Sequence, residues 1–217
     1  MNNKSKVLIL APHTDDGEIG CGGTISMLCR HGLEIYYVAF SAAEKSVGKE
    51  WPRDILYSEV KKAVYRLGLK DENLTVLDFE VREFPRFRQE ILEKMIDFDR
   101  KINPDIVFLP STLDTHQDHQ VISQEGFRAF KRKTILGYEL LWNNLTFTTS
   151  SFFVLDEQDI KRKIEAVKCY KSQRNRYKNL PDTLKKLAEL RGQQIKEKYA
   201  EAYEVIRIVT RTSSIIF

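Results

Sequence analysis

Short continuous runs of apolar residues alternate along the chain with longer segments in which apolar residues recur every three or four positions. The continuous runs are typical of strands that are covered on both faces of a sheet, and the recurring pattern is typical of amphipathic helices. The apolar runs predict strands at 6–11, 34–40, 74–79, 105–109, 135–142, 151–155 and 205–209. The recurring pattern predicts helices at 24–30, 53–67, 87–102, 121–130, 156–170 and 182–203.

The regular alternation of strands and helices indicates βαβ units. We therefore expect an α/β fold with a mostly parallel sheet flanked by helices. With 217 residues, 42% of them hydrophobic, the chain can bury one substantial core. No internal repeat or linker divides the sequence, so the prediction is a single domain over residues 1–217.

Cysteine content and the first residues predict a cytoplasmic protein. The chain has three cysteines, Cys21, Cys29 and Cys169, which form no C-x-x-C pair and leave an odd number, so a disulfide framework is not expected. The apolar run before Pro12 is too short for a signal sequence and far too short to span a bilayer.

Positive charge is concentrated near the C-terminus. The net charge of the chain is +4, but residues 161–198 contain thirteen Lys or Arg against four Asp or Glu. Such a segment can face an anionic ligand, or it can be the solvated face of helices. No aromatic pattern or finger spacing indicates nucleic-acid binding.

The first candidate site follows the strand predicted at 6–11. His13, Asp15 and Asp16 lie where this strand ends and a glycine-rich segment begins. Open α/β sheets bind ligands at the carboxyl ends of their strands. A neutral histidine and an ionised aspartate are common zinc ligands, although a structural polar turn would also account for this segment alone.

A second cluster follows the strand predicted at 105–109. It contains His116, Asp118 and His119, so that three of the four histidines of the chain lie in two acidic loops at strand ends. His116 and His119 are three positions apart and would share a helix face. The two loops together favour a metal site.

A catalytic zinc needs three protein ligands and an open position. Neighbouring side chains diverge, so Asp15 and Asp16 are expected to divide their roles, one as a ligand and the other as a base. The available groups can be divided into metal ligands, His13, Asp16 and His119, and groups for proton transfer and orientation, Asp15, His116 and Asp118.

These two segments carry a resemblance to a known family. Residues 11–24, A-P-H-T-D-D-G-E-I-G-C-G-G-T, are similar to the H-P-D-D-E motif of the PIG-L/LmbE-like zinc-dependent N-deacetylases. Residues 110–119 are similar to the second motif of that family, P-x-x-x-D-x-H-x-D-H. Weaker similarities at 59–68 and 170–173 extend the resemblance over nearly the whole chain.

The resemblance implies a Rossmann-like fold and hydrolysis of an N-acetyl group, usually on a glucosamine-type sugar or its conjugate. It implies that Zn²⁺ is held by His13, Asp16 and His119, that Asp15 is the general base, and that His116 stabilises the oxyanion. Asp118 is a candidate to keep His116 charged. The ligand set is also compatible with Fe²⁺.

The chain departs from the family motif at two positions. Thr14 replaces the usual proline, which is expected to loosen the turn, and Gly17 replaces the usual glutamate, with Glu18 as a candidate substitute. Arg53, ahead of the second predicted helix, either contacts the substrate or is a solvated charge at a helix start.

Two other functions are compatible with parts of this pattern. A metal-dependent phosphoesterase could use the second loop, but a two-metal centre needs more bridging carboxylates than the two motifs contain. A non-catalytic Rossmann-like binding module is the other alternative. For the deacetylase, the expected partner is a small N-acetylated sugar, and the sequence is compatible with a monomer or a homo-oligomer.

Overall fold

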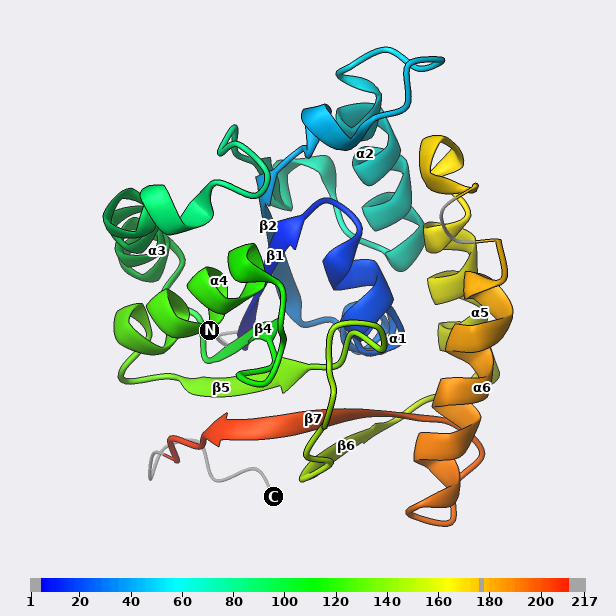
Figure 1. The fold of residues 1–217 in the computed structure, drawn as a ribbon. Helices are drawn as coiled ribbons and strands as arrows, with labels where there is room; N and C mark the ends of the chain where they lie inside the picture. Colours follow the sequence, from blue (N-terminus) through cyan, green and yellow to red (C-terminus); the bar gives the residue numbers. More distant parts are fainter. Residues whose placement is uncertain (1–4, 176–177, 211–217) are drawn as a thin grey trace.

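A seven-stranded sheet forms the centre of the molecule. The structure, a computed structural model, describes residues 5–175 and 178–210. The strand order is β3-β2-β1-β4-β5-β7-β6, and the first five of these strands pair in parallel (Figure 1). β7 pairs antiparallel with both β5 and β6. The strands are β1 (Lys6–His13), β2 (Glu34–Ser41), β3 (Leu74–Val76), β4 (Ile106–Pro110), β5 (Thr134–Tyr138), β6 (Ser151–Val154) and β7 (Ala200–Arg207).

Helices cover both faces of this sheet, as expected for a mostly parallel sheet. The helices are α1 (Asp16–Arg30), α2 (Ile55–Leu67), α3 (Arg88–Ile102), α4 (Gln117–Ala129), α5 (Glu157–Val167) and α6 (Leu180–Gln193). In Figure 1, α3 and α4 lie on one side of the parallel strands, and α1, α2 and α5 lie on the other. The predicted α/β architecture is confirmed. Along the described part of the chain, no helix has the length and apolar composition that a membrane span requires.

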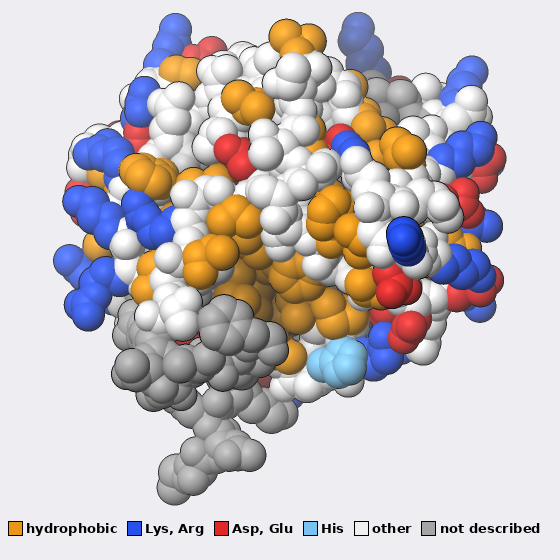
Figure 2. Space-filling model, turned by 90° about the horizontal axis from the view of Figure 1, so that it is seen from below, with side chains coloured by type: hydrophobic (Ala, Val, Ile, Leu, Met, Phe, Trp, Pro, Cys, Tyr) orange, Lys and Arg blue, Asp and Glu red, His pale blue; other side chains and the backbone are white. Residues whose placement is uncertain are grey.

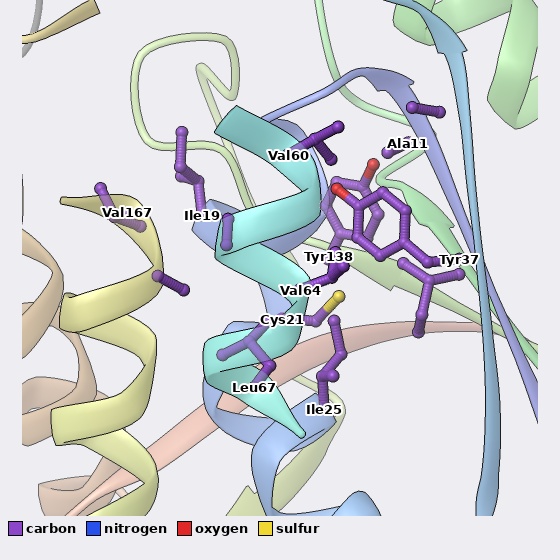
Figure 3. Close-up of a cluster of buried hydrophobic side chains, with 14 of the residues drawn as sticks. Ala11, Ile19, Cys21, Ile25, Tyr37, Val60, Val64, Leu67, Tyr138 and Val167 are labelled. Carbon is purple, nitrogen blue, oxygen red and sulfur yellow. The ribbon is translucent and has the colours of Figure 1, made fainter. Parts of the chain in front are cut away.

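The core consists of two layers because successive strand residues point to opposite faces. In β1, Leu8 and Leu10 pack with α3 and α4, whereas Val7 and Ile9 pack with α1, α2 and α5. Figure 3 shows the second layer, in which side chains of α1, α2 and α5 meet the aromatic rings of β2 and β5. Both layers hold the strand ends in place.

The first helix begins earlier than predicted. We expected a glycine-rich turn followed by a helix from residue 24, but α1 begins at Asp16 and contains these glycines. A Cβ atom at Gly20 would lie 2.3 Å from the ring of Tyr138. The glycines therefore allow this helix to pack closely on the sheet, which places Asp16 directly at the end of β1.

The last helix and the last strand also differ from the prediction. The pattern predicted a helix to residue 203 and a strand at 205–209, but α6 ends at Gln193 and β7 runs from Ala200 to Arg207. Between them, Lys196 has a φ of 61°, which ends the helical path. The Ala- and Glu-containing start of β7 has weak strand propensity, and burial against two neighbouring strands determines its conformation.

Figure 2 shows the molecule from below, where β6 and β7 lie. Hydrophobic side chains gather in a hollow near the middle of this face, and Lys and Arg side chains lie mainly around its edge. β6 is the last strand of the sheet on this side, whereas the site described below lies nearer the middle of the sheet, between β1 and β4.

Candidate metal centre and active site

The site lies at the carboxyl ends of the neighbouring strands β1 and β4. β1 ends at His13 and α1 begins at Asp16, while β4 ends at Pro110 and His116 is the N-cap of α4. Because β1 and β4 pair in parallel, both ends open at the same edge of the sheet. They meet at a cavity of about 160 Å³. The structure therefore brings the two predicted loops together.

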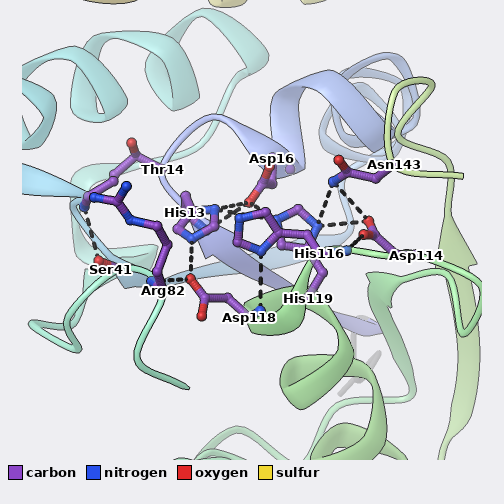
Figure 4. Close-up of polar contacts among 12 residues, drawn as sticks. His13, Thr14, Asp16, Ser41, Arg82, Asp114, His116, Asp118, His119 and Asn143 are labelled. Carbon is purple, nitrogen blue, oxygen red and sulfur yellow. Dashed lines mark hydrogen bonds and ion pairs between the residues drawn. The ribbon is translucent and has the colours of Figure 1, made fainter. Parts of the chain in front are cut away.

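His13, Asp16 and His119 point toward one another from β1, α1 and α4 (Figure 4). The Nδ1 atom of His13 lies 3.1 Å from Oδ2 of Asp16, and Nε2 of His119 lies 3.3 Å from both atoms. In a tetrahedral zinc site with bonds of about 2.0–2.1 Å, neighbouring ligand atoms lie about 3.3 Å apart. The spacing of these three donor atoms fits one face of such a site.

A carboxylate orients each of the two histidines from behind. Nε2 of His13 lies 2.9 Å from Oδ2 of Asp118, and Nδ1 of His119 lies 2.8 Å from Oδ2 of Asp114. These contacts assign a hydrogen to the outer nitrogen of each ring, so the inner nitrogens are the ones that can give lone pairs to a metal once their protons leave. Two lone pairs and the oxygen of Asp16 then converge on one point, an arrangement that favours a cation between them.

The electrostatics of the cluster agree with this geometry. Burial lowers the pKa of His119, but Asp16 and Asp114 outweigh burial and raise it to about 10. Burial also opposes ionisation of Asp16, but His119 and His13 hold its pKa well below the usual range. The carboxylates thus stabilise positive charge at the centre of the cluster, and a metal ion would compete with protons for the same atoms.

The structure gives Asp118 a different partner from the one expected. We predicted that Asp118 keeps His116 charged, but its carboxylate contacts Nε2 of His13 and accepts the backbone N–H groups of Arg82, at 2.6 Å, and Phe84, at 3.3 Å. The side chain of Asp118 turns toward β1, and its negative charge still favours the charged form of His116, so the role toward His116 stays a prediction. Asp118 also joins α4 to β1 and to the segment after β3.

His116 lies beside the cluster and is half-buried. One of its donor nitrogens lies within 4.8 Å of those of His13 and His119. Its Nδ1 accepts the backbone N–H of Asp118 at 3.2 Å, which leaves Nε2 to carry the ring hydrogen. Burial and the neighbouring histidines lower its pKa to about 4. His116 is therefore neutral near pH 7 and remains a hydrogen-bond donor.

Asp15 and Asp16 have different surroundings, and their expected division into a base and a ligand stays a prediction. Asp16 turns into the histidine cluster, whereas Asp15 is the N-cap of α1 and lines the site cavity as well as a larger cavity beside it. Arg53 is exposed, and its guanidinium donates to the carbonyl of Glu44 at 3.2 Å. Arg53 is not among the residues that line the site cavity, whereas Arg82 is. A substrate contact by Arg53 stays a prediction.

The two departures from the family motif are accommodated by two tyrosines. The hydroxyls of Tyr37 and Tyr170 contact the carbonyl of Thr14, at 3.0 and 2.5 Å, and the carboxyl of Glu18, at 2.5 and 2.7 Å. A Cβ atom at Gly17 would lie 2.5 Å from the ring of Tyr37, so this ring needs the glycine. The turn at Thr14 is therefore held from two sides, and Glu18 supports it from within the core.

Sequence reasoning did not select several residues that support the site. Asp114 orients His119, and Asn143 donates to Asp114 at 3.3 Å. Asp114 is the first aspartate of the second motif and Tyr170 begins the Y-K-S-Q segment, so both had a signal in the sequence. Tyr37 and Asn143 had none, because a strand tyrosine and a loop asparagine have many structural roles.

The chain belongs to the GlcNAc-PI de-N-acetylase (PIG-L) family, whose model matches residues 8–130. The match contains both histidine motifs of the site. Deacetylases of this family are metal-dependent in general, and the described histidine cluster is a candidate metal site.

Several known proteins are similar to this chain. A diacetylchitobiose deacetylase of Thermococcus kodakarensis is 27% identical over 194 residues, covering 79% of this chain and 71% of the relative. A probable N-acetyl-alpha-D-glucosaminyl L-malate deacetylase 2 of Bacillus cereus is 26% identical over 176 residues, covering 74% of this chain and 76% of the relative. The crystal structure of a conserved protein from Thermus thermophilus superposes with a TM-score of 0.81 at 24% identity, covering 95% of this chain and 97% of the other. These comparisons confirm the predicted family and the α/β fold.

Proposed function

We propose that this chain is a metal-dependent hydrolase that removes an N-acetyl group from an N-acetylglucosamine-type sugar or its conjugate. The observation that carries the proposal is the convergence of the donor atoms of His13, Asp16 and His119 within 3.1–3.3 Å of one another. Two of the relatives are named for deacetylation of N-acetylated sugar compounds, which supports the same substrate class.

His13, Asp16 and His119 would hold the metal, and the donor set suits Zn²⁺ and also accepts Fe²⁺. Such an ion, when bound, supplies a Lewis acid that polarises the amide carbonyl and lowers the pKa of water. Asp114 and Asp118 position the two histidine rings through their outer nitrogens.

Asp15 is the general base in this proposal. It lines the same cavity as the histidine cluster, so its carboxylate can take a proton from the attacking water. The protonated carboxyl can then pass this proton to the departing amine. Its place at the start of α1 also puts it near the positive end of the helix dipole.

His116 is the oxyanion-stabilising residue in this proposal. Because its Nδ1 accepts the amide of Asp118, its Nε2–H is the group that can donate to the developing negative charge on the amide oxygen. A neutral donor is sufficient for this role, so His116 does not need the charge that the sequence suggested.

Other expectations stay predictions. The order β3-β2-β1-β4-β5 of the parallel strands supports the description of the fold as Rossmann-like. The proposal also includes a single domain over residues 1–217 and a cytoplasmic location. It is compatible with a monomer and with a homo-oligomer.

Two substitutions test the assigned roles. Asp15→Asn should retain the metal and lose most acetate release from N-acetylated glucosamine derivatives, because only the proton acceptor is removed. His119→Ala should lose both metal and activity. Metal content is measured by mass spectrometry of purified protein, and acetate release is measured in a coupled assay.

Asp54→Asn is the matched control for Asp15→Asn, because Asp54 is also the N-cap of a helix but is exposed and lies outside the site cavity. The control should keep both metal and activity. A near wild-type rate in Asp15→Asn would refute its role as the base. Wild-type protein that binds no metal after zinc is added would refute the metal-dependent mechanism, and phosphate release from sugar phosphates without acetate release would favour the phosphoesterase.

A further inference from the structure

A second and larger cavity adjoins the site cavity. Its volume is about 650 Å³, and it shares Asp15 and Gln173 with the smaller cavity around the histidines. A substrate whose acetamide group lies beside Asp15 would therefore extend the rest of its structure into this second cavity.

The walls of the second cavity carry a strong positive charge. Lys168, Lys171, Arg174 and Lys178 line it, and among the described residues of the lining Asp15 is the one acidic residue. Within residues 5–175 and 178–210, none of these four cations forms an ion pair with a carboxylate.

Some basic residues of the segment 161–198 that lie outside the cavity are paired with carboxylates. Lys163, Lys185, Arg191 and Lys198, which do not line the cavity, each form an ion pair with a glutamate. The cations that line the cavity are instead gathered around one hollow without a paired carboxylate among the described residues.

The apolar part of the lining suits a sugar ring. Trp51 and Ile19 form part of the wall on the side of α1 and α2, and Leu180 and Pro181 form part of it at the start of α6. An aromatic side chain beside apolar residues offers a flat surface for the C–H groups of a sugar. A ligand with a sugar ring and an anionic substituent would match both parts of the cavity.

The cation-bearing turn is fixed relative to Asp15. Tyr170 donates its hydroxyl to the carbonyl of Thr14 at 2.5 Å, next to Asp15 in the chain. Ser172 donates its backbone N–H and its hydroxyl to the carboxylate of Glu59, at 3.0 and 2.6 Å. Lys171 follows the first of these anchors directly, so the site of positive charge has a defined place in relation to the proposed base.

From this arrangement we propose that the second cavity binds an anionic group, a phosphate or a carboxylate, on the part of the substrate attached to the amino sugar. The inference rests on the proposed deacetylase function, because it takes the acetamide group to lie at Asp15. Lys171 and Arg174 would bind the anion, and Trp51 would pack against the sugar portion.

Binding of deacetylated products tests this assignment, because the proposed reaction does not convert them. Isothermal titration calorimetry compares glucosamine 1-phosphate and a carboxylated glycoside of glucosamine with neutral methyl glucosaminide. Charge-assisted hydrogen bonds predict that the anionic ligands bind wild-type protein at least about tenfold more tightly at low salt. The two anionic ligands separate a phosphate from a carboxylate as the preferred group.

The variant Lys171→Glu/Arg174→Glu should abolish this preference. Its control is Lys161→Glu/Lys186→Glu, which changes the net charge equally at exposed positions outside the cavity and should retain the preference. Equal affinity of wild-type protein for neutral and anionic ligands would overturn the inference. A preference that persists in the cavity variant, or failure of the anionic ligands to bind wild-type protein, would overturn it too.

Acetate release from the corresponding N-acetylated compounds, measured in parallel, separates the two proposals. Deacetylation of neutral and anionic sugars with equal KM would leave the proposed function standing and refute the anion site. Cavity-dependent binding of anionic products without any acetate release would refute the proposed function, while the cavity would remain an anionic-sugar site.

Discussion

Asp114→Asn is the most direct test of how the candidate metal centre is built. Oδ2 of Asp114 lies 2.8 Å from Nδ1 of His119, and both residues are about 1% exposed. The substitution keeps the size of the side chain but removes the negative charge that makes His119 a stronger ligand. The other oxygen of Asp114 accepts the backbone N–H of His116 at 2.8 Å, and Asn143 donates to Oδ2. The asparagine has one acceptor oxygen for these three donors.

Loss of a carboxylate behind a ligating histidine typically lowers metal affinity about 10- to 100-fold, or roughly 1.4 to 2.8 kcal/mol. We expect the upper half of this range for Asp114→Asn, because the contact is fully buried and solvent does not screen it. Turnover at saturating metal should fall less than the affinity does, because the proposed base, Asp15, is unchanged.

Chelator competition at fixed pH measures the affinity of wild-type and variant protein for Zn²⁺, and circular dichroism checks that the variant is folded. Asp97→Asn is the matched control, because Asp97 is exposed on α3 and contacts only Arg100 among its described ion-pair partners. A folded Asp114→Asn variant with wild-type zinc affinity would refute the argument that His119 is a ligand oriented by this carboxylate.

Two further predictions concern stability. Burial raises the pKa of Glu18 to about 8, whereas the unfolded chain loses this proton near 4.5, so wild-type protein should lose stability as the pH rises through this window. The free energy of unfolding is measured in urea with chelator present. Between pH 5 and 8, the free energy of unfolding of Glu18→Gln should rise by up to roughly 4 kcal/mol relative to that of wild type. A difference between the two proteins that does not change with pH would contradict this explanation. The variant Lys163→Met should lower the free energy of unfolding by about 3–5 kcal/mol, because it leaves the buried carboxylate of Glu201 without its cation. The double variant Lys163→Met/Glu201→Gln should recover part of that loss, and equal stability of Lys163→Met and wild type would show that the pair contributes little.

The sequence by itself determined the order of the elements and the location of the site. Continuous apolar runs and helical periodicity follow from local side-chain spacing, so most strands and helices were predicted within a few residues. The two histidine motifs follow two strands that pair in parallel, and parallel strands present their carboxyl ends at one edge. This rule placed His13 and His119 together without any knowledge of packing.

Tertiary structure alone decided which groups within the site contact each other. Asp118 turns to His13, which lies 105 positions away in the chain, and not to its neighbour His116. Spacing along the chain cannot predict this choice, because it depends on the distance between β1 and the first turn of α4.

The same reason applies to the support behind the site and to the proposed specificity. Glu18 is buried between two tyrosines that lie 19 and 152 positions further along the chain. The sequence showed a basic segment, but only packing of the turn at Lys171 against α1 and α2 places part of its charge beside Asp15. Local patterns determine elements and their order, whereas contacts between distant segments depend on how the elements pack.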